Sequence, residues 1–329
     1  MPWRYIQVDS IDPAFNLALE EYVFESLSQD YNYFILWQND CTVVIGRHQN
    51  TFSEVNEAFL REKGIRVVRR LSGGGAVYHD LGNLNFTFIQ DAAGKAPDLA
   101  LFCHPVAKAI RALGANAQVN GRNDITVDGQ KFSGNAQYVK NGRVMHHGTL
   151  LFDSKLENAS NALRPDIEKI KAKGVASVRS RITNLKPLLP PGTTLENFRE
   201  ALLKALFEKE QMEVYSLTDG DIAAITALKE SRYDTWAWNW GASPACDMTL
   251  SGRVEGCGRI ELRFRVEKGR IAEAALFGDF FSSGDLTALT DSFLGQPATA
   301  EGFQTATEKA DVSCIVGLTK EALLDILSK

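Results

Sequence analysis

The residues with the clearest chemical potential lie in one short segment, Arg69-Arg70-Leu71-Ser72-Gly73-Gly74-Gly75-Ala76-Val77-Tyr78-His79-Asp80. Three consecutive glycines leave the backbone unobstructed, so their N–H groups can turn inward and surround an anion such as phosphate. Arg69 and Arg70 directly precede them and can add charge-assisted hydrogen bonds. The same glycines also fit a plain turn between strands, and the adjacent arginine pair is what favours an anion site.

A second cluster of polar and small residues surrounds Lys131. It comprises Gly121-Arg122-Asn123-Asp124, Asp128-Gly129 and Lys131-Phe132-Ser133-Gly134-Asn135-Ala136. Small side chains beside a lysine are typical of a surface that something approaches closely. A lysine just after a hairpin turn is usually solvated when it stands alone. In this setting it could instead neutralise a carboxylate and a phosphate together, as formation of an acyl-adenylate requires.

Basic residues gather again within 169–181, in Lys169-Ile170-Lys171-Ala172-Lys173-Gly174 and Val178-Arg179-Ser180-Arg181. Such a run is typical of a solvated face. It is also typical of a mobile loop that closes over an anionic intermediate. The pattern of basic residues fits both interpretations.

Several common sites are absent from the sequence. No G-x-x-x-x-G-K-[ST] occurs, which excludes a P-loop, and Gly256-x-Gly258 lacks the third glycine of a dinucleotide-binding turn. No H-E-x-x-H is present, and the adjacent His146 and His147 are expected to point to opposite faces of one strand rather than to chelate a metal. The five cysteines are an odd number without a C-x-x-C pair, so no disulfide framework is predicted.

The elements that must position these residues alternate strands and helices in the first half. Strands are expected at Tyr5–Val8, Tyr33–Trp37, Thr42–Gly46 and Ile65–Arg69. One helix is expected to start at Pro13, with Asp12 as its cap, and a second to cover Val55–Lys63 and end at Gly64. A third helix is expected to start after a capping box formed by Thr193 and Glu196. The dipeptides Asp128-Gly129 and Asn141-Gly142 predict two-residue hairpin turns. These turns divide residues 124–153 into a three-stranded meander and argue against a doubly wound parallel sheet.

The chain changes character after Thr235–Pro244. Ile260, Leu262, Phe264 and Val266 alternate with charged residues, which predicts a strand with one buried face. A turn at Lys268-Gly269, a second strand from Arg270, and helices near Asp285–Leu294 and Thr319–Leu327 are expected to follow. We therefore predict a large domain over residues 1–244 and a small α+β domain over residues 245–329.

Charge and hydropathy exclude two classes of protein. The 36 basic and 41 acidic residues leave a net charge of −5, which argues against binding to nucleic acid or an anionic membrane through bulk charge. No apolar stretch of about 18 residues occurs, and the N-terminus lacks the apolar core of a signal peptide. A soluble cytoplasmic protein is expected, with neither nucleic acid nor membrane as a partner.

Taken together, the motifs resemble those of bacterial lipoate–protein ligases of the long form, which carry a C-terminal accessory domain. The matching segments lie in order over residues 13–185. They are Phe15–Ala18 with Glu20-Glu21, Thr42–Arg47 with Gln49-Asn50, Arg69–Val77 with His79-Asp80 and Gly82-Asn83, Gly121–Asp124, Lys131 with Ser133-Gly134, His146–Leu151, and Val178–Arg181 with Thr183–Leu185.

The resemblance implies an α+β fold, with a biotin-ligase-like catalytic domain of mixed and antiparallel sheets and helices, and a small α+β accessory domain. It also implies a reaction in two steps. Lipoate and ATP, with Mg²⁺, would form lipoyl-AMP and pyrophosphate, and the lipoyl group would pass to a specific lysine. The acceptor would be an apo lipoyl domain of a 2-oxoacid dehydrogenase complex or the glycine-cleavage H protein. No tightly bound prosthetic group is implied.

The resemblance also assigns roles to single residues. Lys131 matches the family lysine that contacts the carboxyl group and the phosphate, and it is the predicted catalytic residue. Predicted ATP contacts are Arg70, Gly75, Ala76, Val77, Tyr78, Lys131 and Arg179. Predicted lipoate contacts are Arg70, Ser72, Gly73, Gly74, His79, Asn83 and Lys131. The segment Asp166–Thr183 would cover the adenylate, and the metal ligands are left open.

Other functions compete with this interpretation. An ATP-independent lipoyl or octanoyl transferase of the same fold would use a cysteine nucleophile. No cysteine lies inside a matching motif, and Cys41 and Cys103 fit packed small hydrophobes better. The C-terminal domain also favours the ligase. A biotin ligase fits the arginine–glycine motif less well, and intact Lys131, Arg70 and Gly73–Gly75 argue against a non-catalytic binder of acyl groups or carrier proteins.

Overall fold

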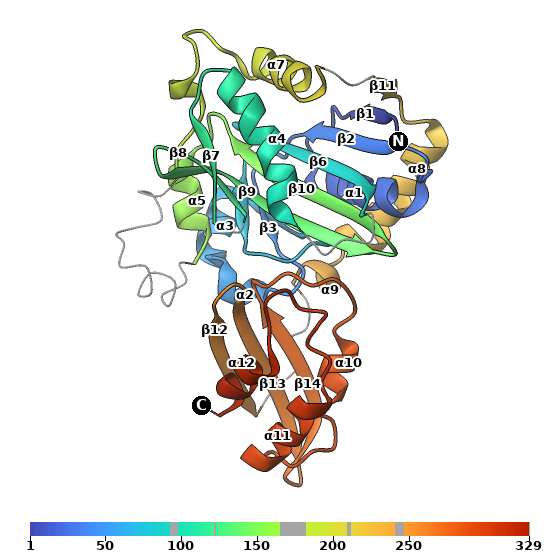
Figure 1. The fold of residues 1–329 in the computed structure, drawn as a ribbon, viewed down its shortest axis with the longest axis vertical. Helices are drawn as coiled ribbons and strands as arrows, with labels where there is room; N and C mark the ends of the chain where they lie inside the picture. The colour runs from blue at the N-terminus through green and yellow to red at the C-terminus, as the bar shows by residue number, and fades with distance from the viewer. Residues whose placement is uncertain (93–97, 122, 165–181, 209–211, 241–246, 329) are drawn as a thin grey trace.

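A large mixed sheet forms the centre of the N-terminal part of the molecule (Figure 1). The computed structural model describes residues 1–92, 98–121, 123–164, 182–208, 212–240 and 247–328. The sheet has the strand order β11-β1-β2-β6-β10-β9-β8-β7. Its strands are β1 (Trp3–Gln7), β2 (Asn32–Trp37), β6 (Asn83–Asp91), β7 (Ala117–Asn120), β8 (Asp124–Val127), β9 (Gln130–Lys140), β10 (Arg143–Leu151) and β11 (Met212–Tyr215). β1 pairs in parallel with β2 and β11, and the other neighbours pair antiparallel, which confirms the expected α+β class.

Two tight turns set the register of the strands that carry Lys131 and the paired histidines. Asp128 and Gly129 have φ values of 49° and 76°, and Asn141 and Gly142 have φ values of 51° and 76°. Positive φ at both central residues is the type I′ geometry that suits the twist of a hairpin. The predicted meander from β8 through β9 to β10 is therefore confirmed.

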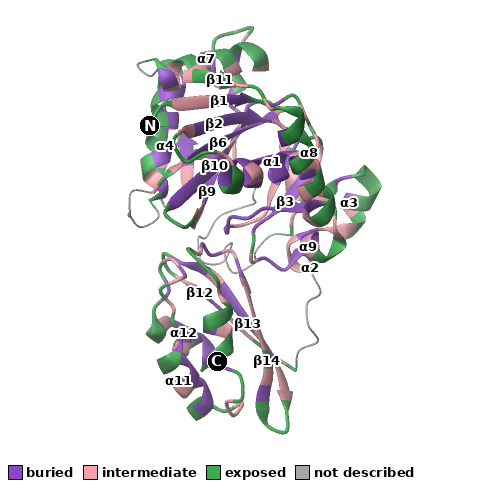
Figure 2. Cartoon of the chain, turned by 90° about the vertical axis from the view of Figure 1, so that its right-hand side faces the viewer, coloured by how far each residue is buried: buried purple, intermediate pink, exposed green. Residues whose placement is uncertain are grey.

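Helices cover both faces of the large sheet, as the burial colouring in Figure 2 shows. They are α1 (Pro13–Ser26) and α8 (Asp219–Leu228) on one face, and α4 (Leu99–Ala112) and α7 (Leu195–Phe207) on the other. Alternate residues of β2 belong to two separate cores. Tyr33, Ile35 and Trp37 pack with α1, whereas Phe34 and Leu36 pack with α4 and α7. Burial on both faces explains why β2 is apolar along its whole length.

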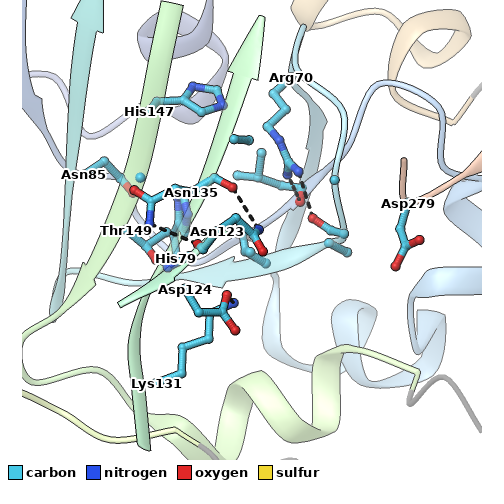
Figure 3. Close-up of a pocket in the computed structure, with 18 of the residues that line it drawn as sticks. Arg70, His79, Asn85, Asn123, Asp124, Lys131, Asn135, His147, Thr149 and Asp279 are labelled. Carbon is cyan, nitrogen blue, oxygen red and sulfur yellow. Dashed lines mark hydrogen bonds and ion pairs between the residues drawn. The ribbon is translucent and has the colours of Figure 1, made fainter. Parts of the chain in front are cut away.

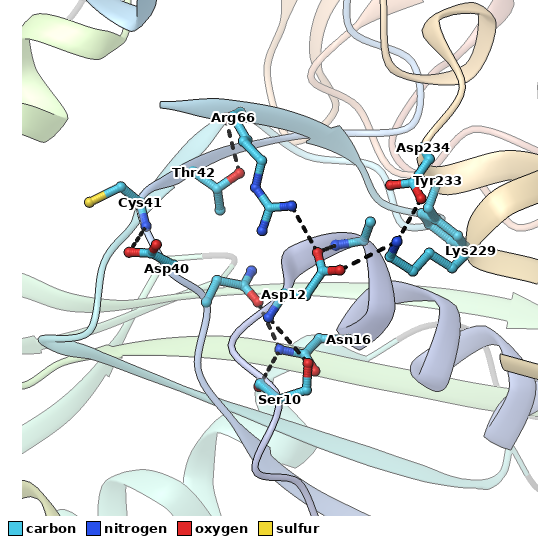
Figure 4. Close-up of polar contacts among 12 residues, drawn as sticks. Ser10, Asp12, Asn16, Asp40, Cys41, Thr42, Arg66, Lys229, Tyr233 and Asp234 are labelled. Atoms are coloured by element: carbon cyan, nitrogen blue, oxygen red, sulfur yellow. Dashed lines mark hydrogen bonds and ion pairs between the residues drawn. The ribbon is translucent and has the colours of Figure 1, made fainter. Parts of the chain in front are cut away.

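The start of α1 contacts two segments that are distant in the sequence (Figure 4). The carboxylate of Asp12 accepts the N–H of Ala14 at 3.1 Å, and Pro13 occupies the first helical position, as predicted. The same carboxylate lies 3.0 Å from Arg66 and 3.5 Å from Lys229. One helix cap thus also ties α1 to the small sheet and to the segment after α8.

A small sheet carries the glycine-rich segment. Its order is β4-β3-β5, with β3 (Thr42–Ile45), β4 (Arg66–Arg69) and β5 (Val77–His79). Three short helices lie beside it, namely α2 (Thr51–Glu54), α3 (Glu57–Lys63) and α5 (Leu156–Ala162). Gly64 ends α3 in the left-handed region with φ 63°, as predicted. Val55 does not begin that helix, because it forms a bridge to Leu163 instead.

The cap of α7 lies one residue beyond its predicted position. Thr194 accepts the N–H of Asn197 at 3.2 Å and is the N-cap, so the predicted capping box of Thr193 with Glu196 is wrong. The hydroxyl of Thr193 instead donates to the carbonyl of Pro190 at 2.6 Å. A local turn therefore takes the hydroxyl that would otherwise have capped the helix.

The C-terminal part builds its own core on a three-stranded antiparallel sheet. Its elements are β12 (Met248–Val254), β13 (Gly258–Glu267), β14 (Arg270–Gly278), α10 (Thr287–Asp291), α11 (Ala300–Lys309) and α12 (Lys320–Leu327). The predicted strand pair and its turn at Lys268-Gly269 are confirmed. Strand β12 and helix α11 were not predicted. Helix α11 buries Phe303 and Ala306 among threonines and a glycine, so its apolar face is too narrow to stand out in the sequence.

The described residues on either side of 241–246 belong to different parts of the chain. Helix α9 (Trp236–Asn239) packs on the first part, where Thr51 donates to the carbonyl of Asn239 at 2.7 Å. The next described residue, Asp247, donates its N–H to Phe264 in the C-terminal sheet. We propose the boundary between residues 244 and 245, within a stretch outside the described residues. Short helical turns complete the chain at Lys186–Leu188 and Lys229–Tyr233, and no described helix is long and apolar enough to cross a membrane.

Candidate active site

A cavity of about 420 Å³ opens between the large sheet, the glycine-rich segment and the C-terminal sheet (Figure 3). Leu17, Trp37, Val44 and Val77 contribute apolar surface. Its polar and charged lining residues are Arg70, His79, Asn85, Asn120, Asn123, Asp124, Lys131, Asn135, His147, Thr149, Arg253 and Asp279. The volume lies in the range of small-molecule sites, about 300–1,000 Å³. The mixture of walls suits a ligand with an apolar and an anionic end.

Arg70 holds the glycine-rich segment in place. Its guanidinium donates to the carbonyls of Val44 at 3.3 Å, Gly73 at 2.7 Å and Gly75 at 2.9 Å, and to the hydroxyl of Ser72 at 3.0 Å. Burial lowers the pKa of Arg70 to about 10, so the side chain stays charged at neutral pH. Arg70 therefore shapes the loop and also places a positive charge beside the cavity.

A chain of hydrogen bonds joins the apolar wall to the glycine-rich segment. Trp37 donates to Thr87 at 2.9 Å, and Thr87 donates to the buried carboxylate of Glu20 at 2.5 Å. The Nδ1 atom of His147 lies 3.0 and 3.1 Å from the two Glu20 oxygens. Its Nε2 atom lies 2.6 Å from the hydroxyl of Ser72. Since the carboxylate only accepts, His147 donates from Nδ1 and accepts from Ser72.

The adjacent histidines point to opposite faces of β10, as predicted. His147 faces the cavity, whereas the ring of His146 stacks on Phe102 at 4.8 Å. The Nε2 atom of His146 lies 3.2 Å from Oδ1 of Asn135. The two imidazoles therefore serve different surroundings, and among the described residues no group of three or more His, Cys, Asp and Glu forms a metal cluster.

His79 presents a hydrogen-bond donor to the cavity. Asn16 donates to Oδ1 of Asn39 at 3.0 Å, which turns the amide nitrogen of Asn39 toward Nδ1 of His79 at 3.1 Å. Because Nδ1 accepts, the ring proton lies on Nε2. Within the described parts of the chain, Nε2 of His79 and Nδ2 of Asn85 are buried without hydrogen-bond partners. Buried donors of this kind are normally satisfied, so ligand oxygens are the natural acceptors.

Lys131 lies at the polar end of the cavity, on β9. Its Nζ atom is 2.7 Å from a carboxylate oxygen of Asp124. The side chain crosses Gly134, where an added Cβ would approach Nζ to 2.9 Å. A close approach to the small residues was predicted, and the side chain of Lys131 itself makes it at Gly134. Asn123 and Asn135 brace this hairpin, each donating its amide to the other's backbone carbonyl at 2.9 and 3.1 Å.

The structure brings most of the predicted site residues together. Those lining the cavity are Arg70, Gly74, Gly75, Ala76, Val77, His79 and Lys131. Ser72 and Gly73 belong to the glycine-rich segment but do not line the cavity, since Ser72 contacts His147 and Gly73 lies against Phe280. Asn83 lies behind Asn85, to which its amide donates at 2.8 Å. The side chain of Tyr78 packs into a separate core. Arg179, Arg122 and residues 166–181 of the predicted covering loop lie outside the described residues.

Arg69 differs from its predicted role beside the glycines. Its guanidinium donates to the carbonyls of Gly46 at 2.9 Å, Gln49 at 2.7 Å and Trp238 at 2.9 Å. These contacts tie the segment after β3 to helix α9, outside the cavity. Arg69 therefore fastens backbone carbonyls and is not available to an anion in the cavity.

Several lining residues were not predicted. Asn85 stands between Asn83 and Thr87 in a polar series at every second position of β6, a signal that the sequence does contain. Trp37 ends an apolar strand and carries no such signal. Arg253 and Asp279 come from the C-terminal sheet, and only the folded chain places them at the cavity.

Three buried histidines predict loss of stability in mild acid. Burial lowers the pKa values of His48 and His79 to about 3 and that of His146 well below its usual value. The unfolded chain binds these protons below pH 6.5 and the folded chain does not. The free energy of unfolding should therefore fall as the pH drops, by up to about 1.4 kcal/mol per pH unit for each group.

Urea unfolding between pH 7.5 and 5.5 measures this slope. The range avoids most carboxylate titration. A His79→Asn variant should show a shallower slope, whereas His104→Ala, on the exposed face of α4, should match the parent protein. Equal slopes for His79→Asn and the parent would contradict the assignment of a neutral buried His79.

The cavity combines apolar walls with the cations Arg70, Lys131 and Arg253, and the comparisons with known families give the enzyme class. Residues 12–207 match the family described as the lipoyl protein ligase A/B catalytic domain. Residues 243–327 match the family described as the bacterial lipoate protein ligase C-terminus. The chain belongs to the lipoate–protein ligase family.

Relatives of this family match nearly the whole chain. The lipoate-protein ligase LplJ of Bacillus subtilis is 40% identical over 321 residues, covering 96% of this chain and 97% of the relative. Lipoate–protein ligase 1 of Staphylococcus aureus is 42% identical over 294 residues, covering 89% of each. Such identity over both parts of the chain supports one shared architecture.

Solved structures agree with this assignment. LipL1 of P. falciparum in complex with lipoate has a TM-score of 0.79 at 23% identity, covering 99% of this chain and 98% of its own, which shows a shared fold. A bipartite lipoate protein ligase of Thermoplasma acidophilum, from a structural analysis that also covers its E2 lipoyl domain, has a TM-score of 0.66 at 26% identity, covering 75% and 100%. Lipoate-protein ligase A bound with ATP has a TM-score of 0.62 at 25% identity, covering 73% and 99%.

Proposed function

We propose that the protein activates lipoate with ATP and transfers the lipoyl group to a lysine of an apo lipoyl domain. The observation that carries this proposal is a single cavity with three kinds of wall. Apolar side chains such as Trp37 suit the acyl chain. The unpartnered donors of His79 and Asn85 suit its carboxyl end. Lys131 and Arg70 suit the phosphate of an adenylate.

In the first step, a carboxylate oxygen of lipoate attacks the α-phosphorus of ATP. The new oxygen–phosphorus bond forms as the bond to the β-phosphate breaks, and pyrophosphate leaves. Two anions must meet in line for this reaction, so their repulsion has to be offset by fixed positive charge. We assign contact with both reacting groups to Lys131, because its side chain lines the cavity, and Arg70 keeps the bordering loop in shape.

Mg²⁺ enters this proposal as part of the ATP substrate. Among the described residues, the carboxylates that line the cavity are those of Asp124 and Asp279, and they face the cations of Lys131 and Arg253. Magnesium commonly binds one or two carboxylates together with substrate phosphates. When bound, it would offset the charge of the departing pyrophosphate.

In the second step, the neutral amine of the acceptor lysine attacks the carbonyl carbon of lipoyl-AMP. The carbon–nitrogen bond forms, AMP leaves, and the nitrogen releases a proton. We propose the lipoyl domains of 2-oxoacid dehydrogenase complexes and the glycine-cleavage H protein as acceptors. The structural analysis of the Thermoplasma relative and its E2 lipoyl domain supports this class of partner. A cytoplasmic location stays a prediction from the sequence.

A reconstituted assay tests the proposal. Purified protein, lipoate, ATP, Mg²⁺ and an unmodified lipoyl domain should give a domain heavier by one lipoyl group in intact-protein mass spectrometry. Omission of ATP should prevent the gain in mass. A lack of modification with ATP, together with transfer from a lipoylated donor domain, would establish the transferase alternative. A lack of both would favour a non-catalytic binder.

Cysteine replacement separates the ligase from a thiol-dependent transferase. Burial raises the pKa of the Cys103 thiol to about 12, so this sulfur is a poor nucleophile. Neither Cys103 nor Cys41 lines the cavity. We expect Cys41→Ala and Cys103→Ala to keep the rate of lipoylation per folded molecule within about twofold. A loss of turnover with retained folding, measured by circular dichroism, would support a cysteine mechanism.

A further inference from the structure

The C-terminal sheet docks directly on the glycine-rich segment. The N–H of Gly74 donates to the carbonyl of Phe280 at 3.1 Å, and the N–H of Gly278 donates to the carbonyl of His48 at 2.7 Å. The ring of His48 stacks on Phe280 at 4.7 Å. A Cβ at Gly73 would approach the Phe280 carbonyl to 2.1 Å, so this contact requires glycine. The connection after β14 is thus held against the loop that borders the cavity.

This docking brings one ion pair of the C-terminal sheet to the cavity wall. Arg253, near the end of β12, and Asp279, just after β14, both line the cavity. Their side chains lie 3.4 Å apart, and Figure 3 shows Asp279 across the cavity from Lys131 and Asn135. The cavity is therefore closed by charged groups from both parts of the chain.

Asp279 is held firmly enough to orient its partner. One of its oxygens accepts the N–H of Arg259 at 2.5 Å, while the other faces Arg253. Gly258 makes this possible, because φ there is 134° and a Cβ would lie 2.6 Å from that same Asp279 oxygen. A carboxylate fixed by the backbone can hold a flexible guanidinium in one place.

We propose that Arg253, positioned by Asp279, contacts the β- and γ-phosphates of ATP and stabilises the departing pyrophosphate. This inference rests on the proposed ligase function. Among the described residues, the cationic side chains that line the cavity are Arg70, Lys131 and Arg253. Arg70 spends its donors on the loop, and Lys131 lies beside Asp124. Arg253 is the cation on the opposite, C-terminal side, where a leaving group could extend away from the acyl pocket.

The chemistry confines the effect of Arg253 to one half-reaction. When the carboxylate oxygen bonds to the α-phosphorus, the electron pair of the broken bond leaves with pyrophosphate, and no proton moves. A guanidinium beside the β- and γ-phosphates stabilises that growing charge. Transfer to the acceptor lysine begins after pyrophosphate has left, so it should not need Arg253.

Measuring the two half-reactions separately tests the proposal. With lipoate, ATP and Mg²⁺, Arg253→Ala should release pyrophosphate about 100-fold more slowly than the parent protein. With synthetic lipoyl-AMP and an unmodified lipoyl domain, the same variant should lipoylate within about twofold of the parent rate. Arg253→Lys should release pyrophosphate at a rate between those of the parent protein and Arg253→Ala, since a lysine keeps the charge but loses the planar fork.

A matched control distinguishes this role from simple loss of charge on the sheet. Arg265→Ala removes an arginine of β13 that pairs with Glu267 and Glu273, away from the cavity, and it should leave both half-reactions unchanged. Unchanged pyrophosphate release in Arg253→Ala would overturn the proposal, as would an equal loss in both half-reactions. If Arg253→Ala fails to fold, a raised KM for ATP in folded Arg253→Lys supports the proposal and an unaltered KM overturns it. Inactivity of the parent protein would instead remove the ligase function itself.

Discussion

We expect Lys131→Ala to slow formation of lipoyl-AMP by about 100-fold or more. Lys131 is the cation at the polar end of the cavity, and its Nζ atom is held 2.7 Å from Asp124 across Gly134. A preorganised charge of this kind stabilises the transition state without having to move. Loss of one such contact typically costs about 2.7–4 kcal/mol of barrier, which corresponds to about 100- to 1,000-fold in rate.

Single-turnover release of pyrophosphate measures the effect of Lys131→Ala directly. Lys140→Ala is the matched control, because Lys140 lies on the same strand and pairs with Glu25 at the surface. That variant should adenylate lipoate at the parent rate. If Lys131→Ala adenylates normally, Lys131 has no part in the mechanism. Lys131→Arg should retain part of the rate, since it keeps a positive charge at the same end of the cavity.

The second large effect is expected for Arg70→Lys. A lysine ammonium cannot reproduce the fork that donates at once to Ser72, Gly73 and Gly75. Buried carbonyls left without donors cost about 1–3 kcal/mol each. We therefore expect the free energy of unfolding to fall by about 2–4 kcal/mol, and adenylation to slow by about 10- to 100-fold because the loop loses its shape.

Urea unfolding and pyrophosphate release together test this prediction. Arg66→Lys is the matched control, because Arg66 is half-exposed and pairs with Asp12 on the surface. An exposed pair contributes little, so the control should stay within about 0.5 kcal/mol of the parent. Arg70→Lys with parent stability and parent rate would show that the loop keeps its shape without the guanidinium.

The network behind the loop explains why these substitutions should affect more than one property. Ser72 joins Arg70 to His147, and His147 joins the loop to the buried Glu20. The serine hydroxyl accepts from one neighbour and donates to the other, and the side chain is buried. The hydrogen bonds of Ser72 to Arg70 and His147 fix the loop, and Ser72 is buried and does not line the cavity. The apolar wall at Trp37 and the loop held by Arg70 are consequently joined by one network of hydrogen bonds.

Features set by neighbouring residues were predictable from the sequence. The two hairpin turns need positive φ at two consecutive positions, and Asp128-Gly129 and Asn141-Gly142 satisfy that need locally. The helix cap at Asp12 and the strand pair around Lys268-Gly269 are likewise determined by residues next to one another in the chain. Where local signals competed, the prediction failed, as when Thr193 closed a turn and Thr194 capped the helix.

Features set by contacts between distant segments were not predictable in this way. Arg69 and Arg70 are adjacent and alike in the sequence, yet one fastens Gly46 and Trp238 and the other shapes the glycine-rich segment. Side chains of adjacent residues on an extended backbone point to opposite sides, which separates the two arginines. Which of the two sides faces the cavity depends on the elements that pack around the segment. The same holds for Tyr78, whose side chain turns away from the cavity that its neighbour Val77 lines.

By itself, the sequence determined the family, the glycine-rich segment with Arg70, and the lysine after the hairpin, because each depends on residues close together in the chain. The tertiary structure alone decided that Arg253 and Asp279 complete the cavity, about 100 residues or more beyond those motifs. It also decided that His79 offers a free donor, since Asn16 and Asn39 set its tautomer. Long-range packing and hydrogen-bond direction leave no periodic trace in a sequence, so neither could be inferred before the fold was known.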